Sequence, residues 1–208
     1  MFYYIVIILA CLPLFLLFPT RVKGRKNLPK KGRMILCCNH QSNWDVVMLA
    51  TRIFRRRFRY MAKASLFKNK FIGFILRKLG GYPVQRSNTD ISAIKKTLSH
   101  LQNERAVCIF PEGARLKTED KNDLRDGAII FALKTKSPIV PACIIKKFRI
   151  FVFNKMVIGE PFNLSEMEEF KNKKINKELI AKGREILREK MFGLYNEHAP
   201  KKDIKKAA

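Results

Sequence analysis

Residues 34–45 read MILCCNHQSNWD, and this stretch decides the fold of the chain. Its first five residues, 34–38, are all apolar and have the length and composition of a buried strand. A short polar turn follows, and from Trp44 to about residue 55 the apolar positions return at helical spacing. A strand that passes through a short turn into a helix is the repeating unit of α/β folds.

The same alternation of short apolar runs and helical patterns continues along the chain. Further strands are predicted at residues 59–62, 82–85, 106–110 and 139–145. Further helices are predicted at residues 71–79, 90–103, 127–134 and 175–195. Because strands alternate with helices, we expect an α/β fold with a mostly parallel or mixed central sheet flanked by helices.

Glycine and hydroxyl residues mark the ends of two of these helices. Gly80, with a second glycine directly after it, is expected to end the helix at 71–79. Ser87 or Thr89 is available as the N-cap of the helix at 90–103, because a side-chain oxygen there can accept from the first free amides.

Two segments are assigned on weaker signals. Residues 149–153 and 156–158 are expected to form a hairpin around Asn154-Lys155, because two apolar runs flank a polar pair. Residues 22–31 are basic and contain glycine and proline, so we interpret them as a linker.

The chain is strongly basic. Of its 208 residues, 43 are Lys or Arg and 17 are Asp or Glu, which gives a formal net charge of +26. Apolar residues make up 47%, enough for one domain with a substantial core. The excess positive charge implies a polyanionic partner, either nucleic acid, an anionic membrane or a phosphorylated substrate. Charge alone does not choose among these three.

The first nineteen residues, MFYYIVIILACLPLFLLFP, contain no charged side chain. As a helix they would cover roughly 28 Å, close to the hydrocarbon thickness of a bilayer. A secretory signal peptide is the competing interpretation, but the basic segment that should precede its apolar core is missing. We therefore expect an uncleaved N-terminal membrane-anchoring helix over residues 1–20.

This anchor implies an organisation for the whole chain. Residues 21–198 are expected to form the folded domain, and residues 199–208 a basic tail. Basic residues follow the anchor at once, so the positive-inside rule places the domain on the cytoplasmic side of the cell membrane. Pro13 leaves open whether the anchor spans the bilayer or bends within one leaflet.

The cysteines indicate a reducing compartment. Each lies in an apolar run and their number is odd: Cys11, Cys37, Cys38, Cys108 and Cys143. We expect reduced, buried thiols and no disulfide framework. A zinc site at Cys37, Cys38 and His40 is not expected, because adjacent residues of a strand point to opposite faces and no second pair of ligands follows.

His40 stands out among the three histidines because it directly follows a predicted strand. Open α/β sheets bind their ligands at the carboxyl ends of strands. A neutral imidazole there can remove a proton from a hydroxyl, and Asp45, one helical turn on, can orient the ring. The spacing from Ser42 to Asp45 also fits a helix cap, in which Asp45 only binds backbone amides. Both interpretations are open at this point.

A second candidate site follows the strand predicted at 106–110. Gly113 permits close approach of the backbone to a ligand, and Arg115 can form a bidentate pair with phosphate. Glu112 can orient Arg115 or accept a hydrogen bond from a polyol. An ordinary turn with a surface arginine is the alternative for this segment.

Four blocks of sequence together resemble those of the 1-acylglycerol-3-phosphate acyltransferases. Residues 39–45, NHQSNWD, are similar to the family's motif of histidine, four residues and aspartate. Three further segments of this chain resemble the family's second, third and fourth blocks. They are GYPVQR at 81–86, FPEGAR at 110–115 and IVP at 139–141. The four blocks have the family's order and spacing, and a weaker late element at 157–161 extends the resemblance over about residues 22 to 165.

The resemblance implies a reaction and a role for each site residue. His40, oriented by Asp45, would remove the proton from the sn-2 hydroxyl of 1-acylglycerol 3-phosphate (lysophosphatidic acid), which then attacks an acyl thioester and yields phosphatidic acid. The donor would be an acyl-carrier protein or coenzyme A thioester, and no metal or prosthetic group is expected. Substrate-binding roles fall to five further residues: Lys63, Arg86, Glu112, Gly113 and Arg115.

The roles within this second group differ. Arg86 and Arg115 would hold the phosphate, and Glu112 and Gly113 would shape the pocket. Lys63 lies where the family carries a lysine between its first two blocks, and it or backbone amides would stabilise the oxyanion. The expected partners are anionic membrane lipid, the lysolipid and the acyl donor.

Two other functions remain as alternatives. One is acyl transfer to another acceptor, such as glycerol 3-phosphate or another lysophospholipid. The other is a non-catalytic basic protein that binds membrane or nucleic acid. This second alternative gives no reason for an uncharged N-terminal segment. We therefore expect no nucleic-acid partner.

Overall fold

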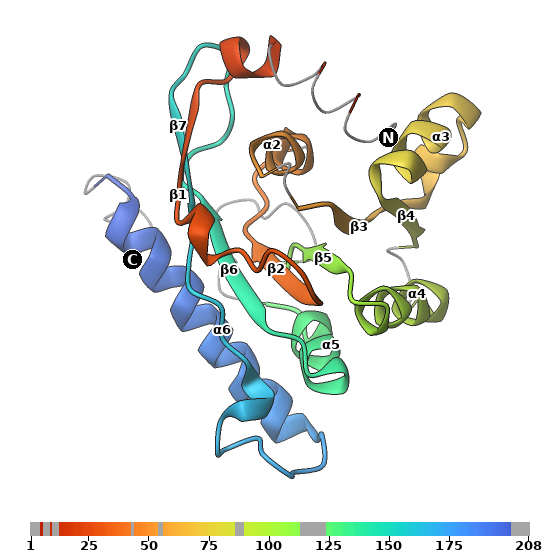
Figure 1. Ribbon diagram of the computed structural model, residues 1–208, viewed down its shortest axis with the longest axis vertical. Helices are drawn as coiled ribbons and strands as arrows, with labels where there is room; N and C mark the ends of the chain where they lie inside the picture. Colours follow the sequence, from red (N-terminus) through yellow and green to blue (C-terminus); the bar gives the residue numbers. More distant parts are fainter. Residues whose placement is uncertain are drawn as a thin grey trace.

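The computed structural model describes residues 5, 9, 13–42, 44–53, 56–85, 90–112 and 124–200. Within these ranges one twisted sheet carries helices on both of its faces (Figure 1). The fold is the predicted α/β architecture.

The sheet has seven strands in the order β1-β7-β6-β2-β5-β3-β4. Every neighbouring pair is parallel except β6 and β7, which are antiparallel, so the sheet is mixed. The strands are β1 (Thr20–Lys23), β2 (Met34–Cys38), β3 (Phe58–Lys63), β4 (Gly81–Val84), β5 (Ala106–Ile109), β6 (Ile139–Ile144) and β7 (Asn154–Ile158).

The α-helices lie close to their predicted positions. The helices described in full are α2 (Trp44–Arg52), α3 (Lys70–Leu79), α4 (Ile91–Gln102), α5 (Gly127–Thr135) and α6 (Lys177–His198). Three short 3-10 helices join them: η1 (Arg25–Asn27), η2 (Ala64–Phe67) and η3 (Leu164–Glu166). The predicted cap of α4 was wrong. Asp90 is the N-cap and accepts from the Ala93 amide at 3.0 Å, whereas Ser87 and Thr89 lie outside the described residues.

The sheet separates two apolar cores, and β2 contributes to both. Ile35 and Cys37 face one core, together with residues of α4, α5 and α6. Leu36 and Cys38 face the other core, together with residues of α2. The two adjacent cysteines thus point to opposite faces, as the strand geometry predicts. The four cysteines of the described ranges are free and buried, and Cys11 lies outside those ranges.

Two assignments at the β7 side of the sheet were wrong. Residues 22 and 23, predicted as linker, belong to β1, which pairs with β7. The predicted hairpin within 149–158 does not form, because β7 pairs with β6 instead. Asn154 is a buried strand residue, whose side chain accepts from the Lys146 amide at 3.2 Å and donates to the Lys146 carbonyl. It therefore closes the loop between β6 and β7.

Half of the predicted anchor at residues 1–20 falls outside the described residues. Of its described part, residues 13–17 are helical and Phe18 is buried in the α2-side core. The guanidinium of Arg52 donates to the carbonyls of Leu14 and Phe18 at 2.9 and 2.8 Å, which ties this segment to α2. No helix within the described ranges is both long enough and apolar enough to cross a membrane. Most of the predicted basic tail, residues 201–208, is also outside those ranges.

The glycine that ends α3 provides a test of the fold. Gly80 has a left-handed backbone with φ of 103°, and an added Cβ would clash with the Phe58 carbonyl oxygen. We expect Gly80→Ala to lower the free energy of unfolding by about 2 kcal/mol, measured by urea denaturation. The matched control is Gly193→Ala in α6, where a Cβ meets no atom within 4 Å. This change should be neutral or stabilise by up to about 1 kcal/mol, and equal losses in both variants would contradict the explanation.

Candidate active site

The parallel strands bring the described site residues, which include Asp45 at the start of α2, to one edge of the sheet. Strands β2, β3, β4, β5 and β6 run in the same direction, so their carboxyl ends lie at the same edge. His40 follows β2, Lys63 ends β3 and Glu112 follows β5. The remaining predicted residues lie outside the described ranges: Arg86, Gly113 and Arg115.

The carboxylate of Asp45 is the centre of the site. Its side chain is 0% exposed. One oxygen, Oδ2, accepts from His40 Nδ1 at 2.9 Å and from the amides of Gln41 and Ser42 at 2.6 and 2.7 Å. The other oxygen accepts from Ser42 Oγ at 3.0 Å. Asp45 therefore caps the turn and also contacts the imidazole, so the interpretation in which it binds backbone amides alone is wrong.

The ring of His40 is held in one orientation. Because a carboxylate only accepts, Nδ1 must donate to Asp45, which leaves the lone pair on Nε2. One face of the ring stacks on Phe110, with centroids 4.3 Å apart and planes inclined by 28°. The backbone amide of His40 donates to Glu112 Oε2 at 3.1 Å. The site thus presents a ring nitrogen, Nε2, whose orientation is fixed by the contacts of the rest of the residue.

Two functional side chains next to His40 were missed from the sequence. Asn39 Nδ2 donates to the Ile144 carbonyl at 2.9 Å, and Asn39 Oδ1 accepts from the Ile144 amide at 2.7 Å. Gln41 Nε2 donates to the same carbonyl at 3.0 Å. The Asn39 side chain thereby continues the β2–β6 pairing beyond the last backbone pair and fixes the turn. Polar residues on both sides of His40 were the available signal.

Lys63 and Glu112 differ in how closely they approach the base. Glu112 binds the His40 backbone directly, so part of its role is to shape the turn. Lys63 is exposed at the end of β3, which is the second strand from β2 across the sheet. It is paired in register with Val84 of β4, two residues before Arg86.

The nearby thiols are unsuited to act as nucleophiles. Cys38 lies two residues before His40, and burial, reinforced by the neighbouring thiols and carboxylates, raises its pKa well above the ordinary value. Burial raises the pKa of Cys108 to about 12, with a smaller contribution from Asp45. Both are therefore protonated at neutral pH, and a protonated thiol is a poor nucleophile.

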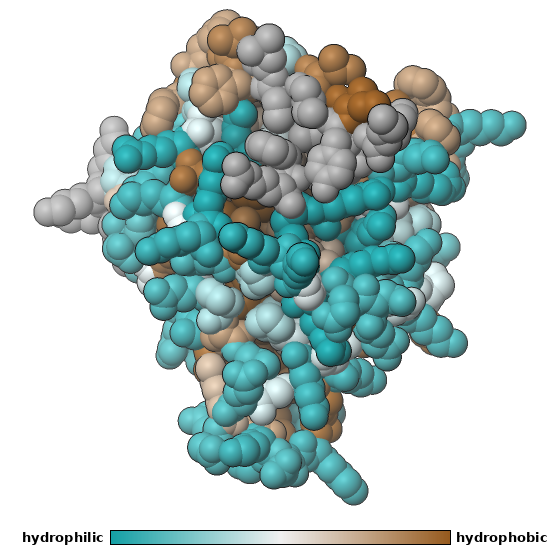
Figure 2. Space-filling view, viewed as in Figure 1, coloured by the Kyte–Doolittle hydropathy of each residue, from teal (hydrophilic) through white to brown (hydrophobic). Residues whose placement is uncertain are grey.

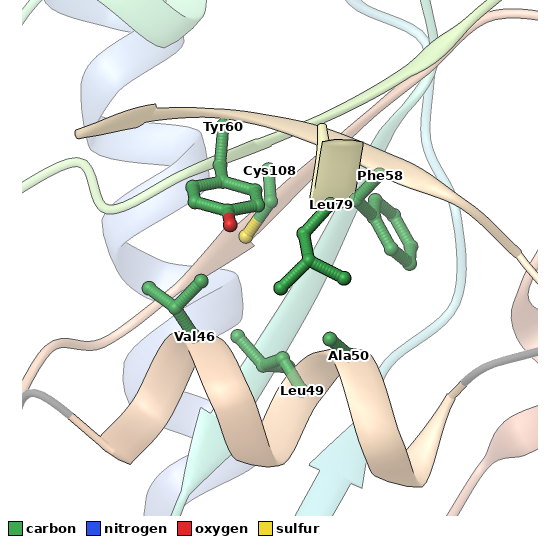
Figure 3. A pocket seen from close by; sticks show the side chains of 7 residues that line it. All are labelled: Val46, Leu49, Ala50, Phe58, Tyr60, Leu79 and Cys108. Carbon is green, nitrogen blue, oxygen red and sulfur yellow. The ribbon is translucent and has the colours of Figure 1, made fainter. Parts of the chain in front are cut away.

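A small apolar cavity lies between α2 and the residues of β3, β5 and α3 that face it. Figure 3 shows side chains of α2 on one side facing strand and helix residues on the other. Its lining residues are Val46, Leu49, Ala50, Phe58, Tyr60, Leu79 and Cys108. Its volume of about 20 Å³ suits roughly one water molecule, so a fatty acyl chain would need these side chains to move apart. Within the described ranges no group of three or more potential ligands could hold a metal ion.

The chain is similar to known proteins both in sequence and in fold. A family model described as Acyltransferase matches residues 19–145. The 1-acyl-sn-glycerol-3-phosphate acyltransferase of Bacillus subtilis (strain 168) is 32% identical over 85% of this chain and 88% of its own length. The protein of the same name from Streptococcus pneumoniae is 30% identical over 68% of this chain and 54% of its own length.

A solved structure has the same fold. It is the crystal structure of the 1-acyl-sn-glycerophosphate (LPA) acyltransferase PlsC from Thermotoga maritima, with a TM-score of 0.63. The match covers 87% of this chain and 73% of that chain, at 23% sequence identity.

The contact between His40 and Asp45 predicts which ring nitrogen carries the proton. We expect ¹⁵N NMR of labelled histidine to show the Nδ1–H tautomer for His40 when the ring is neutral. Asp45→Asn should reverse the tautomer, because an amide can donate to Nδ1. Ser42→Ala, which removes one contact of Asp45 but none of His40, should leave it unchanged. His100 and His198 serve as internal references, and an Nε2–H tautomer in the native protein would rule out the assigned geometry.

Proposed function

Because this chain belongs to the acyltransferase family, we propose that it transfers a fatty acyl group from an acyl thioester to the sn-2 hydroxyl of 1-acylglycerol 3-phosphate. The product is phosphatidic acid. One feature of the site supports this function above the others: His40 Nδ1 lies 2.9 Å from the buried carboxylate of Asp45, at the carboxyl edge of the sheet. This pair supplies the general base that acylation of a hydroxyl needs.

The reaction follows from the orientation of His40. Nε2 removes the proton from the sn-2 hydroxyl, and the oxygen attacks the thioester carbonyl to form a tetrahedral intermediate. Asp45 stabilises the imidazolium that forms. The intermediate then collapses and expels the thiolate, which recovers the proton from His40. Lys63 or backbone amides are the candidate donors to the oxyanion.

Direct transfer, without an acyl-enzyme, fits the side chains near the base. Cys38 is buried and its pKa is raised, so it is not a thiolate at neutral pH. Ser42 is also buried, with its hydroxyl bound between Asp45 and the Trp44 amide. The reaction as proposed uses no metal and no prosthetic group.

The substrate and donor contacts extend the same proposal. Arg86 and Arg115, which follow β4 and β5 in the sequence, hold the lysolipid phosphate, and Gly113 allows its close approach. The acyl donor is a thioester of acyl-carrier protein or coenzyme A. The net charge of +26 and the uncharged N-terminal segment support a location at the cell membrane, with the catalytic domain on the cytoplasmic side.

Loss of the base should slow transfer strongly without loss of the fold. We expect His40→Ala to lower kcat by about a thousandfold, since general base catalysis contributes roughly 10²–10⁴. Circular dichroism should show unchanged secondary structure. The control is His100→Gln on α4, which should retain activity. Mass spectrometry of the product with purified protein is the measurement, and near-native turnover by His40→Ala would overturn the mechanism.

The phosphate contacts should appear as a selective change in KM. Arg86→Ala or Arg115→Ala should raise the KM for the phosphorylated acceptor about ten- to a hundredfold, with a much smaller effect on the acyl donor. Lysine at either position should recover only part of the loss, because the bidentate fork is absent. Arg188→Ala, an exposed arginine paired with Glu185 on α6, is the control. Equal changes in both KM values would indicate a structural role instead.

A further inference from the structure

The loop between β6 and β7 exposes four consecutive apolar side chains. Ile150, Phe151, Val152 and Phe153 are 57%, 76%, 42% and 63% exposed. Single exposed apolar residues are common on protein surfaces, but a contiguous exposed group marks an interaction site. Phe148, three residues before Phe151, is buried, so the loop contributes to the core and still directs this run outward.

The backbone of the loop is held in place at its tip. The Phe151 amide donates to the Leu17 carbonyl at 2.7 Å, and the Val152 amide donates to the Arg149 carbonyl at 3.2 Å. Phe151 has a left-handed backbone with φ of 59°, which a bulky side chain disfavours and asparagine or glycine adopts more readily. Neither the turn nor the core therefore favours an aromatic residue here. Packing within the described part of the chain therefore gives no reason for an aromatic residue at this position.

The helical segment 13–17 extends the same surface. Its Phe15 and Leu16 are 57% and 64% exposed, and its Leu17 carbonyl receives the Phe151 amide. In Figure 1 this segment lies beside the β6–β7 loop at the top of the molecule, and Figure 2 shows hydrophobic surface gathered along that edge. We call the six exposed residues, Phe15, Leu16 and Ile150–Phe153, the apolar edge.

Basic residues border the apolar edge. Lys146, Lys147 and Arg149 precede the exposed run within the same loop and are themselves exposed. Within the loop no acidic residue offsets them. Apolar side chains bordered by cations suit an anionic bilayer, in which the hydrocarbon takes the apolar groups and the headgroup phosphates attract the cations.

We propose that the β6–β7 loop inserts its apolar tip into the surface of an anionic bilayer and thereby sets the height of the active site above it. Ile150, Phe151 and Phe153 enter the hydrocarbon boundary, while Lys146, Lys147 and Arg149 lie among the headgroups. The proposal rests on the proposed function in one respect, which is that the bilayer supplies the lysolipid acceptor.

The loop is joined directly to the catalytic turn. It begins after Ile144, whose backbone is bound by Asn39 and Gln41 on either side of His40. Phe148 of the loop packs edge-on against Phe18, with ring centroids 6.3 Å apart. The Phe18 ring in turn lies beside the Trp44 ring, with centroids 5.2 Å apart. The depth of the inserted tip therefore fixes the position of His40 relative to the lipid phosphates.

A fluorophore at the tip can test insertion in the full-length chain. Cys11→Ser with Phe151→Cys gives one accessible thiol, because the four other cysteines are buried. Labelled with an environment-sensitive dye, it should shift to the blue on phosphatidylglycerol vesicles and be quenched by lipids that carry a spin label in the acyl chain. The matched control is Ile175→Cys, which is 40% exposed in the segment that leaves the opposite edge of the sheet after β7 and should show neither change. An aqueous spectrum at position 151 on these vesicles would overturn the proposal.

A second variant measures the contribution of the tip to binding. Phe151→Asn suits the left-handed backbone, so it should retain or raise the melting temperature while it lowers partition onto phosphatidylglycerol vesicles about tenfold. Ile175→Ser, at the opposite edge of the sheet, should leave partition unchanged. Unaltered partition of Phe151→Asn, or a dye shift that depends on protein concentration in the absence of lipid, would reject the bilayer as partner. Both measurements omit acceptor and donor, so their outcome is independent of whether the chain transfers an acyl group.

Discussion

The site depends on one buried carboxylate. An ionised group with no exposed surface is strongly destabilising unless its oxygens are fully hydrogen-bonded, and Asp45 meets this condition with four donors. Two of the donors are backbone amides of the turn, one is a hydroxyl and one is the ring of His40. Satisfying the charge therefore shapes the strand-to-helix turn and orients the base at the same time. Folding and chemistry cannot be separated at this residue.

The strands on either side of β2 complete the constraint. From the β5 side, Glu112 accepts from the backbone amide of His40. From the β6 side, Ile144 is bound by the side chains of Asn39 and Gln41. The turn that carries His40 is thus fixed by its two neighbours in the sheet as well as by Asp45 within its own segment. Contacts of this kind keep a base in position before substrate arrives, which is how preorganised sites contribute to rate.

Most features that depend on nearby residues were predicted from the sequence, although the N-cap of α4 was not, and specific contacts between distant partners were missed. The strand at 34–38, the helix after it and the contact between His40 and Asp45 all lie within a short segment. By contrast, β1 carries two basic residues and is defined by pairing with β7, more than 130 residues away. Asn39 and Gln41 act on Ile144, which is more than 100 residues distant. A sequence pattern read over a few neighbouring residues carries no information about pairings between residues so far apart.

The failed hairpin at 149–153 has a different cause. An apolar run bounded by polar residues predicts a segment that avoids water, but it does not state where the side chains go. In a strand they would enter the core, whereas here Ile150–Phe153 remain on the surface beside the helical segment 13–17. Because the same hydrophobic effect drives burial in a protein core and in a bilayer, sequence periodicity cannot distinguish the two destinations. In the structure this run is exposed and bordered by cations, which is consistent with insertion into a bilayer and not with burial in the core.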